Sequence, residues 1–559
     1  MLSEFFRRLK LSPRWTTEIL LTSLLVNILA LGSSLYSIQV LNRYMALGID
    51  STLITLTLGV LLAVLFEILL RKARLKISQI ACYSADQSLS RVVFAGLGLS
   101  EYQLMARFPV AKRREFLTGL QNVTNAFSAV NLNTICDAPF SLVFLCALYW
   151  ISPKLTFYMA ILIGLVGIFS LYQQFRMRST TEQISQDTLK SSALAQFLIT
   201  QLETTRTFNA QTRLLKRWKE DFFEGAGTKS KLQVQQNSVQ QASYSGSVLT
   251  TIIIYGLGAR EVMLGNLNIG TLIGASILAN RALSNITRTL QLGDTFVKAR
   301  HGLGLIAALG KITLERDSGH VPSEFQGKLE LKDLAFQYPE AKNPVFESFD
   351  LEVPRGAIIA VRGSNGSGKT TLARILSGLM QPSRGQILVD GTELSQLVPE
   401  WWRKQLVYLP QEPGFLEISL LENLRINAPE RSQEEVLQCC NQLGLGAFLN
   451  QLEEGLEHIV RGGGAQLPVG IRRRLAFVRA MLTGGQLVVL DEPTEGIDPE
   501  GCKAISQILN QMVHKKLTLV LMTNDPFVLD VAHLVVDLDS KPKPEVSNKS
   551  STVNREKAS

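Results

Sequence analysis

Residues 357–376 read AIIAVRGSNGSGKTTLARIL, an apolar run followed by a glycine-rich loop and a helix-like segment. Glycines let such a loop turn its N–H groups toward a polyphosphate, and the following helix adds the positive end of its dipole. A glycine-rich turn with an incidental lysine is the alternative, but the complete match between a strand and a helix disfavours it. We therefore expect a nucleoside triphosphate to bind at Gly363, Ser364, Asn365, Gly366, Ser367, Gly368, Lys369, Thr370 and Thr371. Lys369 would reach the β- and γ-phosphates, and Thr370 would hold Mg²⁺.

Six apolar runs in the first half of the chain are long enough to cross a membrane. At 559 residues the chain exceeds a single core, and its second half resembles an ordinary soluble α/β domain. Each run covers a hydrocarbon core of about 30 Å at ~1.5 Å per residue. Arg260, Glu261 and Arg281 interrupt or border the last two runs, so buried soluble helices are the alternative there. The six runs are residues 17–40, 52–70, 135–152, 155–173, 246–265 and 269–287.

Lysine and arginine residues cluster on one side of these runs, which places both termini and the phosphate loop in the cytoplasm. The net charge of +9 follows from this topology, and no basic patch interleaved with aromatic residues supports nucleic-acid binding. The N-terminal MLSEFFRRLKLSPRW has no cleavage site and resembles an amphipathic helix on the membrane surface. The six cysteines lack zinc-ligand spacing and are expected to be reduced packing residues.

The composition divides the chain into four parts. We expect a transmembrane domain over 1–310, a polar linker over 311–327, a nucleotide-binding domain over 328–540 and a disordered tail over 541–559. The outer connections, 41–51, 153–154 and 266–268, are short, whereas the cytoplasmic connections, 71–134 and 174–245, are long and rich in helix-forming residues.

The segment QLVVLDEPT at 486–494 resembles the Walker B strand of ATP-binding cassette (ABC) proteins. The resemblance implies that Asp491 supports Mg²⁺ together with Thr370 and Gln411, and that Glu492 polarises the attacking water. It further implies a D-loop at Asp498, a Q-loop at Gln411 and an adenine-stacking aromatic at Tyr338. The fold it implies is an all-α six-helix transmembrane domain followed by an α/β P-loop nucleotide-binding domain, as in half-transporters of the ABC exporter type that hydrolyse ATP.

Two positions depart from that family's pattern. Leu467, Pro468, Val469, Gly470 and Ile471 stand where the family has the signature LSGGQ, which acts on the nucleotide of the opposite subunit. Asn524 stands where the family has its switch histidine, and an amide cannot carry positive charge. Pro468 replaces the signature serine, whose hydroxyl would donate to the γ-phosphate, and loss of a transition-state donor slows hydrolysis by about 10² to 10³. We therefore favour a heterodimer with a more regular ABC half over a homodimer, and a regulatory half with weak hydrolysis is an alternative.

Three segments of the membrane half resemble one particular group of ABC exporters. The segments VLNRY at 40–44, GIDSTL at 48–53 and CDAPFSLVF at 136–144 are similar to bacterial type I secretion ATPases. That implies export of a polypeptide across the inner membrane with a periplasmic adaptor and an outer-membrane channel. Asp137 is either a functional acid at the mouth of a span or a helix cap. About sixteen residues precede the first span, so we expect no N-terminal peptidase-like domain. Export of a small peptide or a siderophore-like compound is the alternative.

Overall fold

The structure, a computed structural model, describes residues 2–45, 48 and 50–548 and divides into two compact units. The helical unit takes residues 1–100 and 107–313, and the nucleotide-binding unit takes residues 101–106 and 314–559. The division at Thr313 and Leu314 falls inside the stretch expected to be a linker. Residues 46–47 and 49 of the first outer connection, and 549–559 of the expected tail, lie outside the described residues.

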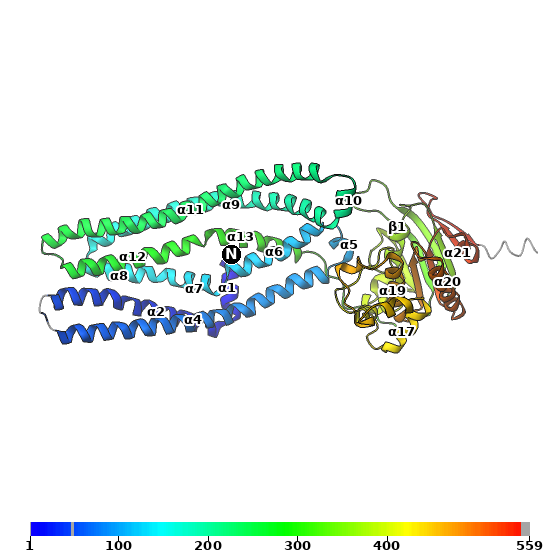
Figure 1. The fold of residues 1–559 in the computed structure, drawn as a ribbon, viewed down its shortest axis with the longest axis horizontal. Coiled ribbons are helices and arrows are strands. Elements are labelled where there is room, and N and C mark those ends of the chain that lie inside the picture. The colour runs from blue at the N-terminus through cyan, green and yellow to red at the C-terminus, as the bar shows by residue number, and fades with distance from the viewer. Residues whose placement is uncertain (1, 46–47, 49, 549–559) are drawn as a thin grey trace, which may run out of the picture. The chain divides into compact units, whose positions relative to one another are not determined.

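The helical unit consists of helices and their short connections (Figure 1). Its helical segments are α1 (Leu2–Leu11), α2 (Pro13–Gln39), η1 (Val40–Tyr44), α4 (Asp50–Gly98), α6 (Val110–Ala126), α7 (Ala129–Asp137), η2 (Ala138–Phe140), α8 (Ser141–Ile151), α9 (Pro153–Thr200), α10 (Leu202–Thr207), α11 (Gln211–Met263), α12 (Ile269–Gln291) and α13 (Gly293–Leu309).

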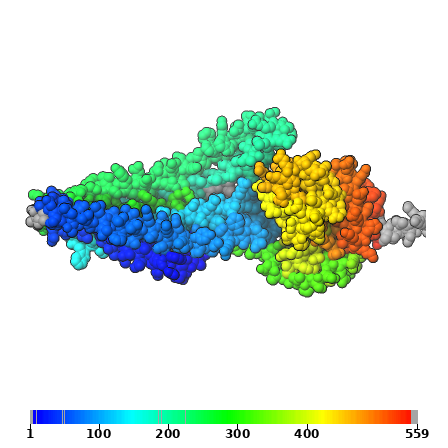
Figure 2. Space-filling model, turned by 60° about the horizontal axis from the view of Figure 1, so that its bottom comes forward, coloured from blue at the N-terminus to red at the C-terminus, as the bar shows by residue number. Residues whose placement is uncertain are grey.

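Long helices in this unit pack side by side, α2 with α4 and α9 with α11 (Figure 1). One core between α8, α9, α11 and α12 contains the buried Leu148, Leu155, Met159 and Ile254. On α4, by contrast, leucines such as Leu58 and Leu61 are exposed, and this helix forms part of the surface in Figure 2. Apolar side chains that stay exposed over the membrane-length part of a helix suit a lipid-facing surface.

The six expected spans coincide with helical segments, apart from one or two residues at the C-terminal ends of the third and fifth. Among the described residues, four helical stretches combine the length and apolarity of a membrane span: Pro13–Tyr44, Asp50–Gly98, Ala129–Ile151 and Pro153–Thr200. The two remaining segments lie on α11 and α12, whose polar residues dilute their hydropathy. The N-terminal segment forms α1, and its Arg8 is buried against Asp86 of α4 at 2.7 Å.

Asp137 does not act as a helix cap. It precedes η2, but its side chain makes no capping hydrogen bond there. The carboxylate instead accepts two hydrogen bonds from Arg74, at 2.6 and 3.0 Å, and one from Asn27 at 2.9 Å. The capping interpretation is therefore wrong, because an ion pair inside the bundle uses both carboxylate oxygens.

The nucleotide-binding unit is an α/β structure. Its strands are β1 (Leu329–Phe336), β2 (Phe346–Val353), β3 (Ile358–Arg362), β4 (Arg384–Val389), β5 (Thr392–Glu393), β6 (Leu406–Leu409), β7 (Leu487–Asp491), β8 (Thr518–Met522), β9 (Leu534–Asp537) and β10 (Glu545–Asn548). Its helices are α5 (Tyr102–Met105), α14 (Lys369–Leu376), η3 (Leu394–Gln396), α15 (Pro399–Lys404), α16 (Leu420–Leu424), α17 (Gln433–Gln442), α18 (Gly446–Gln451), η4 (Gly455–Glu457), η5 (Gly462–Gly464), α19 (Val469–Leu482), α20 (Pro499–His514) and α21 (Pro526–Val531).

Two sheets organise this unit. Strands β2, β1, β4 and β5 form an antiparallel sheet, and the larger sheet has the order β10-β9-β3-β8-β7-β6. In the larger sheet β9, β3, β8, β7 and β6 run parallel, and their side chains are almost wholly buried. Helices α16, α17, α19 and α20 cover one face, and α14 together with the antiparallel sheet covers the other. Ligands of open parallel sheets bind beyond the carboxyl ends of the strands, so that edge positions the candidate site.

Two segments differ from the expected domain bounds. Residues 101–106, expected in the transmembrane domain, belong to the nucleotide-binding unit, where the Gln103 side chain accepts a hydrogen bond from the N–H of Gln381 at 3.2 Å. Residues 545–548, expected to be disordered, form β10, which pairs antiparallel with β9 from Glu545 opposite Asp537 to Asn548 opposite Leu534. Backbone pairing thus orders a stretch whose polar composition predicts disorder.

Candidate functional site at the carboxyl edge of the parallel sheet

The phosphate loop connects β3 to α14, as the sequence predicts. Gly366 and Gly368 have φ of 85° and 115°, a backbone region that disfavours side chains. A Cβ atom at Gly368 would lie 2.4 Å from Cγ1 of Val345, so only glycine fits there. The loop therefore delivers the N-terminus of α14, with its unpaired N–H groups, to the edge of the sheet.

Lys369 is buried at the first position of α14, with 7% of its surface exposed. Its Nζ donates a hydrogen bond to the carbonyl of Gly363 at 2.6 Å and lies 3.4 Å from Oε1 of Glu492. A buried ammonium needs partners. These two contacts hold the charge beside the loop, where a phosphate would be a stronger partner.

Asn524 follows β8 and contacts the same loop. Its Nδ2 donates to the carbonyl of Gly363 at 2.9 Å, and its Oδ1 accepts from the N–H of Gly363 at 3.0 Å. The predicted switch position therefore lies at the phosphate loop, and its amide satisfies both polar groups of one residue of that loop.

Asp491 ends β7 and is 1% exposed. Both carboxylate oxygens are buried and have no hydrogen-bond partner within the described part of the chain. Burial raises the pKa of this carboxyl, and Thr370 and Arg374 partly oppose that rise. The Thr370 hydroxyl donates a hydrogen bond to Oε1 of Gln411 at 3.4 Å. A buried carboxylate without a donor, beside a hydroxyl and an amide oxygen, fits the oxygen ligands that Mg²⁺ prefers.

Glu492 is the next residue and has a left-handed backbone, with φ of 48°. Its N–H donates to the carbonyl of Met522 at 2.9 Å, which fixes the chain at the sheet edge. Non-glycine residues in this conformation cluster at functional sites. Burial raises the pKa of the Glu492 carboxyl, and the nearby Lys369 ammonium opposes that rise.

The predicted signature segment leads into α19. Leu467 is buried, Pro468 precedes the first turn as N-cap, and Val469 is 50% exposed. Gly470 passes close to a neighbouring loop, since a Cβ atom there would lie 3.3 Å from the carbonyl of Gly496, and Ile471 is partly buried. The N-terminus of α19 thus presents a branched side chain to solvent where the family's pattern has glycine.

Two arginines of α19, neither of them predicted as a site residue, join this helix to the loop after β7. Nη1 of Arg473 donates to the carbonyls of Glu492 (3.1 Å) and Glu495, and Nη2 pairs with Oε2 of Glu495 at 2.9 Å. Nη2 of Arg474 lies 3.5 Å from Oδ1 of Asp498, the predicted D-loop acid. Both arginines are buried, and three consecutive arginines at 472–474 were the available signal.

The remaining predicted residues surround the loop. The Tyr338 hydroxyl lies 2.9 Å from Oγ1 of Thr371, and its ring packs edge-on against Phe336 at 5.0 Å between centroids. Oγ of Ser367 is buried without a hydrogen-bond partner among the described residues, whereas Asn365 is exposed. The tyrosine ring, 37% exposed, therefore lies beside the helix that carries the loop's threonines.

Residues 539–541, which follow β9, form hydrogen bonds with the phosphate loop that no sequence pattern indicated. The Asp539 carboxylate accepts hydrogen bonds from the N–H of Ser364, at 2.9 and 3.0 Å, and from its hydroxyl at 2.7 Å. These bonds lower the pKa of Asp539. Nζ of Lys541 donates to the carbonyl of Ser367 at 2.8 Å. Both ends of the loop are thus tied to one short segment.

Comparisons with known proteins agree with this geometry. Residues 346–495 match the ABC transporter family. The chain is 25% identical over 524 residues to the alpha-hemolysin translocation ATP-binding protein HlyB of Escherichia coli O157:H7, covering 94% of this chain and 74% of that protein. It is 25% identical over 516 residues to the leukotoxin translocation ATP-binding protein LktB of Mannheimia glucosida, covering 90% and 71%.

Among solved structures, one bacterial Atm1-family ABC exporter with ATP bound superposes with a TM-score of 0.81. That match covers 98% of this chain and 96% of the other at 18% identity, so it establishes the fold alone. The expected fold class, helices followed by an α/β nucleotide-binding domain, is confirmed.

Proposed function

We propose that this chain, an ABC transporter ATPase in which a transmembrane domain is fused to the nucleotide-binding domain, exports polypeptides in a type I secretion system. The observation that carries this proposal is the similarity to proteins named for hemolysin and leukotoxin translocation, which extends over 90% or more of the chain. A periplasmic adaptor and an outer-membrane channel would complete the route.

ATP binding is proposed to use the carboxyl edge of the parallel sheet. The loop N–H groups and Lys369 would hold the phosphates, and Tyr338 would stack on adenine. Mg²⁺, when bound by Thr370, Gln411 and Asp491, would neutralise phosphate charge. Glu492 would take a proton from the attacking water as the bond to the γ-phosphate breaks, because its carboxylate lies at the mouth of the loop beside Lys369.

Two nucleotide-binding domains would close on ATP, each supplying the signature helix to its neighbour's nucleotide. Closure would pull on the long helices of the transmembrane domain, and hydrolysis would release them. We favour a second, more regular ABC half as the partner, since Pro468 and Val469 in this chain remove a hydroxyl donor and a close backbone approach. In a mixed pair, Asn524 would be the only departure at the site that contains Glu492.

We place the protein in the bacterial inner membrane with both termini in the cytoplasm. Support comes from the arginines and lysines that flank the spans on one side, such as Arg7, Arg71 and Lys298.

The test measures ATP-dependent uptake of cargo into inside-out membrane vesicles that contain the full chain with its partner subunit. Lys369→Ala and Glu492→Gln should each abolish ATP-dependent uptake, because one removes phosphate binding and the other removes the base. Lys503→Ala, an exposed lysine on α20, is the matched control and should transport normally. Uptake at the parental rate by Lys369→Ala would refute the proposal.

Two alternatives make different predictions. If the cargo is a small peptide or a siderophore-like compound, that compound should stimulate ATPase activity in the absence of any adaptor. If the chain is a regulatory half with weak hydrolysis, which Pro468 and Asn524 favour, Glu492→Gln should leave transport undiminished. Co-purification with a periplasmic adaptor would favour protein secretion over both.

A further inference from the structure

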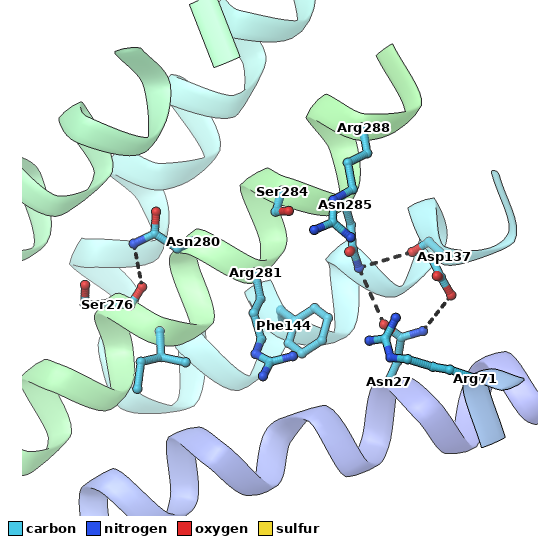
Figure 3. Close-up of a pocket in the computed structure, with 11 residues that line it drawn as sticks. Asn27, Arg71, Asp137, Phe144, Ser276, Asn280, Arg281, Ser284, Asn285 and Arg288 are labelled. Atoms are coloured by element: carbon cyan, nitrogen blue, oxygen red, sulfur yellow. Dashed lines mark hydrogen bonds between the residues drawn. The ribbon is translucent and has the colours of Figure 1, made fainter. Parts of the chain in front are cut away.

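A polar cavity of about 460 Å³ lies inside the helical unit, between α2, α4, the junction of α7 with α8, and α12 (Figure 3). Polar and charged groups are costly inside a membrane bundle and mark functional sites by default. The lining is nevertheless dominated by them: Asn27, Arg71, Asp137, Phe144, Ser276, Ile277, Asn280, Arg281, Ser284, Asn285 and Arg288.

Most of these residues come from one face of α12. Residues four apart lie above one another on a helix. Positions 276, 280, 284 and 288 form one such row, and positions 277, 281 and 285 form the adjacent row. Of these seven residues, only Ile277 is apolar. The opposite side of α12 carries buried apolar residues, among them Leu272, Leu278 and Leu283. One face of α12 is therefore polar and lines the cavity, while the opposite face packs in the apolar bundle.

The acids near the cavity are already paired. The Asp137 carboxylate receives both Nη atoms of Arg74, which is 4% exposed, at 2.6 and 3.0 Å. Oε1 of Glu67 lies 2.7 Å from Nη2 of Arg71. Two acids are therefore balanced by two arginines, and neither acid is left to neutralise the remaining cations.

Arg281 and Arg288 are those remaining cations. Arg281 is partly buried, and its Nη2 donates to the Ser33 hydroxyl at 3.0 Å. Arg288 is exposed on the cavity wall. Within the described residues neither guanidinium has a carboxylate within salt-bridge distance. The cavity consequently carries an excess of two positive charges, surrounded by the amides of Asn280 and Asn285.

We propose that this cavity binds carboxylate side chains of the exported polypeptide, an inference that rests on the proposed function for the identity of the cargo. A guanidinium presents paired N–H donors that match a carboxylate, and neighbouring amides and hydroxyls match a peptide backbone. The volume is typical of pockets for small ligands, ~300–1,000 Å³, so it holds a few residues of an extended chain. The ligand class is therefore an acidic, unfolded segment.

The position of the cavity suits an initial docking step. Asp137 and Arg288 stand at the cytoplasmic ends of their spans in the proposed orientation, and Asn27 stands near the middle of its span. A carboxylate drawn in from the cytoplasm would therefore meet Arg288 before Arg281. The attraction to Arg281 is less screened than that to Arg288, because Arg281 is partly buried and Arg288 is exposed.

The experiment measures binding of a fluorescent glutamate-rich peptide to the full chain in nanodiscs of zwitterionic lipid without nucleotide. A glutamine version and a lysine version of equal length are the peptide controls. Arg281→Gln and Arg288→Gln should each weaken glutamate-peptide binding about tenfold, the loss expected for one charged hydrogen-bonded contact. Arg281→Lys should retain most of the binding. Arg176→Gln, an exposed arginine on α9 outside the cavity, should change nothing.

Equal binding of the glutamate and glutamine peptides, or unchanged binding by both arginine variants, would overturn the inference. A second result would also overturn it. In nanodiscs of anionic lipid, peptide binding would be lost and the protein would retain lipid stoichiometrically in a manner that depends on Arg281. The ligand would then be a lipid headgroup. Because peptide binding is measured without ATP, it separates the two proposals. A parent chain that binds the peptide but exports no polypeptide would contradict the proposed function alone.

Discussion

The side-chain amide of Asn524 is paired with the backbone of Gly363, donating from Nδ2 to the carbonyl at 2.9 Å and accepting at Oδ1 from the N–H at 3.0 Å. The same carbonyl also accepts from Nζ of Lys369 at 2.6 Å. The residue at the switch position therefore fixes the start of the phosphate loop and shares an acceptor with the lysine that would bind phosphate.

Asn524→Ala should weaken ATP binding. It leaves the N–H of Gly363 without its partner and leaves the carbonyl with Lys369 as its remaining donor, and an unmet buried hydrogen bond costs ~1–3 kcal/mol. We expect the ATP affinity of the full chain to fall about tenfold, measured with a fluorescent ATP analogue. Asn510→Ala, on α20 away from the loop, is the control. Parental affinity in Asn524→Ala would show that the pairing does not position the loop.

Arg473→Leu should reduce both stability and turnover. The guanidinium is buried and holds the carbonyls of Glu492 and Glu495, so its loss strands two acceptors next to the proposed base. We expect a lower Tm and a fall in kcat larger than the change in KM. Arg472→Leu on the same helix is the control, because its side chain donates no hydrogen bond among those the structure describes. Equal effects of the two substitutions would exclude a specific role.

The phosphate loop, the Walker B acids and the switch position were predictable because each is a short motif tied to the end of one strand. Their mutual contacts follow from parallel strand order, which brings the ends of β3, β7 and β8 to one edge. Arg473 and Asp539 were not predictable, because their roles depend on pairings between segments distant in sequence. The order of β10 was missed for the same reason, since ladder pairing with β9 outweighs its polar composition.

Asp539→Ala should raise the KM for ATP several-fold and leave kcat unchanged. The carboxylate orders Ser364 by accepting from its N–H and hydroxyl, but it lies outside the loop and would not contact the γ-phosphate. Steady-state ATPase kinetics of the full chain test this split. Glu545→Ala, an exposed acid on β10, should match the parent. A fall in kcat without a change in KM would contradict this positioning role.

The ATPase pH profile should report the environment of Glu492. Burial raises its pKa above 4.5, so the protonated form, which cannot act as a base, persists to higher pH than for an exposed glutamate. Activity should therefore be lost as pH falls through the raised pKa. Glu495 contributes to the rise, so Glu495→Gln should move the acid limb to lower pH, while Glu434→Gln on α17 should not. An unmoved limb in Glu495→Gln would remove Glu492 as the titrating group.

Restoring the signature is the sharpest test of the proposed partner. In Pro468→Ser with Val469→Gly, a hydroxyl donor returns to the N-terminus of α19, and the side chain that is 50% exposed at 469 disappears. A regained transition-state donor is worth ~10² to 10³ in rate. If two copies of this chain form the working sites, ATPase activity of the purified chain should rise at least about tenfold.

The mixed pair predicts a different result. There, the partner supplies the signature to the site that contains Lys369 and Glu492, so the restored segment acts only on the partner's nucleotide. Hydrolysis at the site that contains Lys369 and Glu492 should then be unchanged when Pro468→Ser and Val469→Gly are added to the pair, and any gain in activity should require the partner's own phosphate loop. Val469→Ala, which shortens the side chain without restoring the hydroxyl, controls for bulk. A large rise in the purified chain alone would contradict the heterodimer, because it would require productive sites between identical copies.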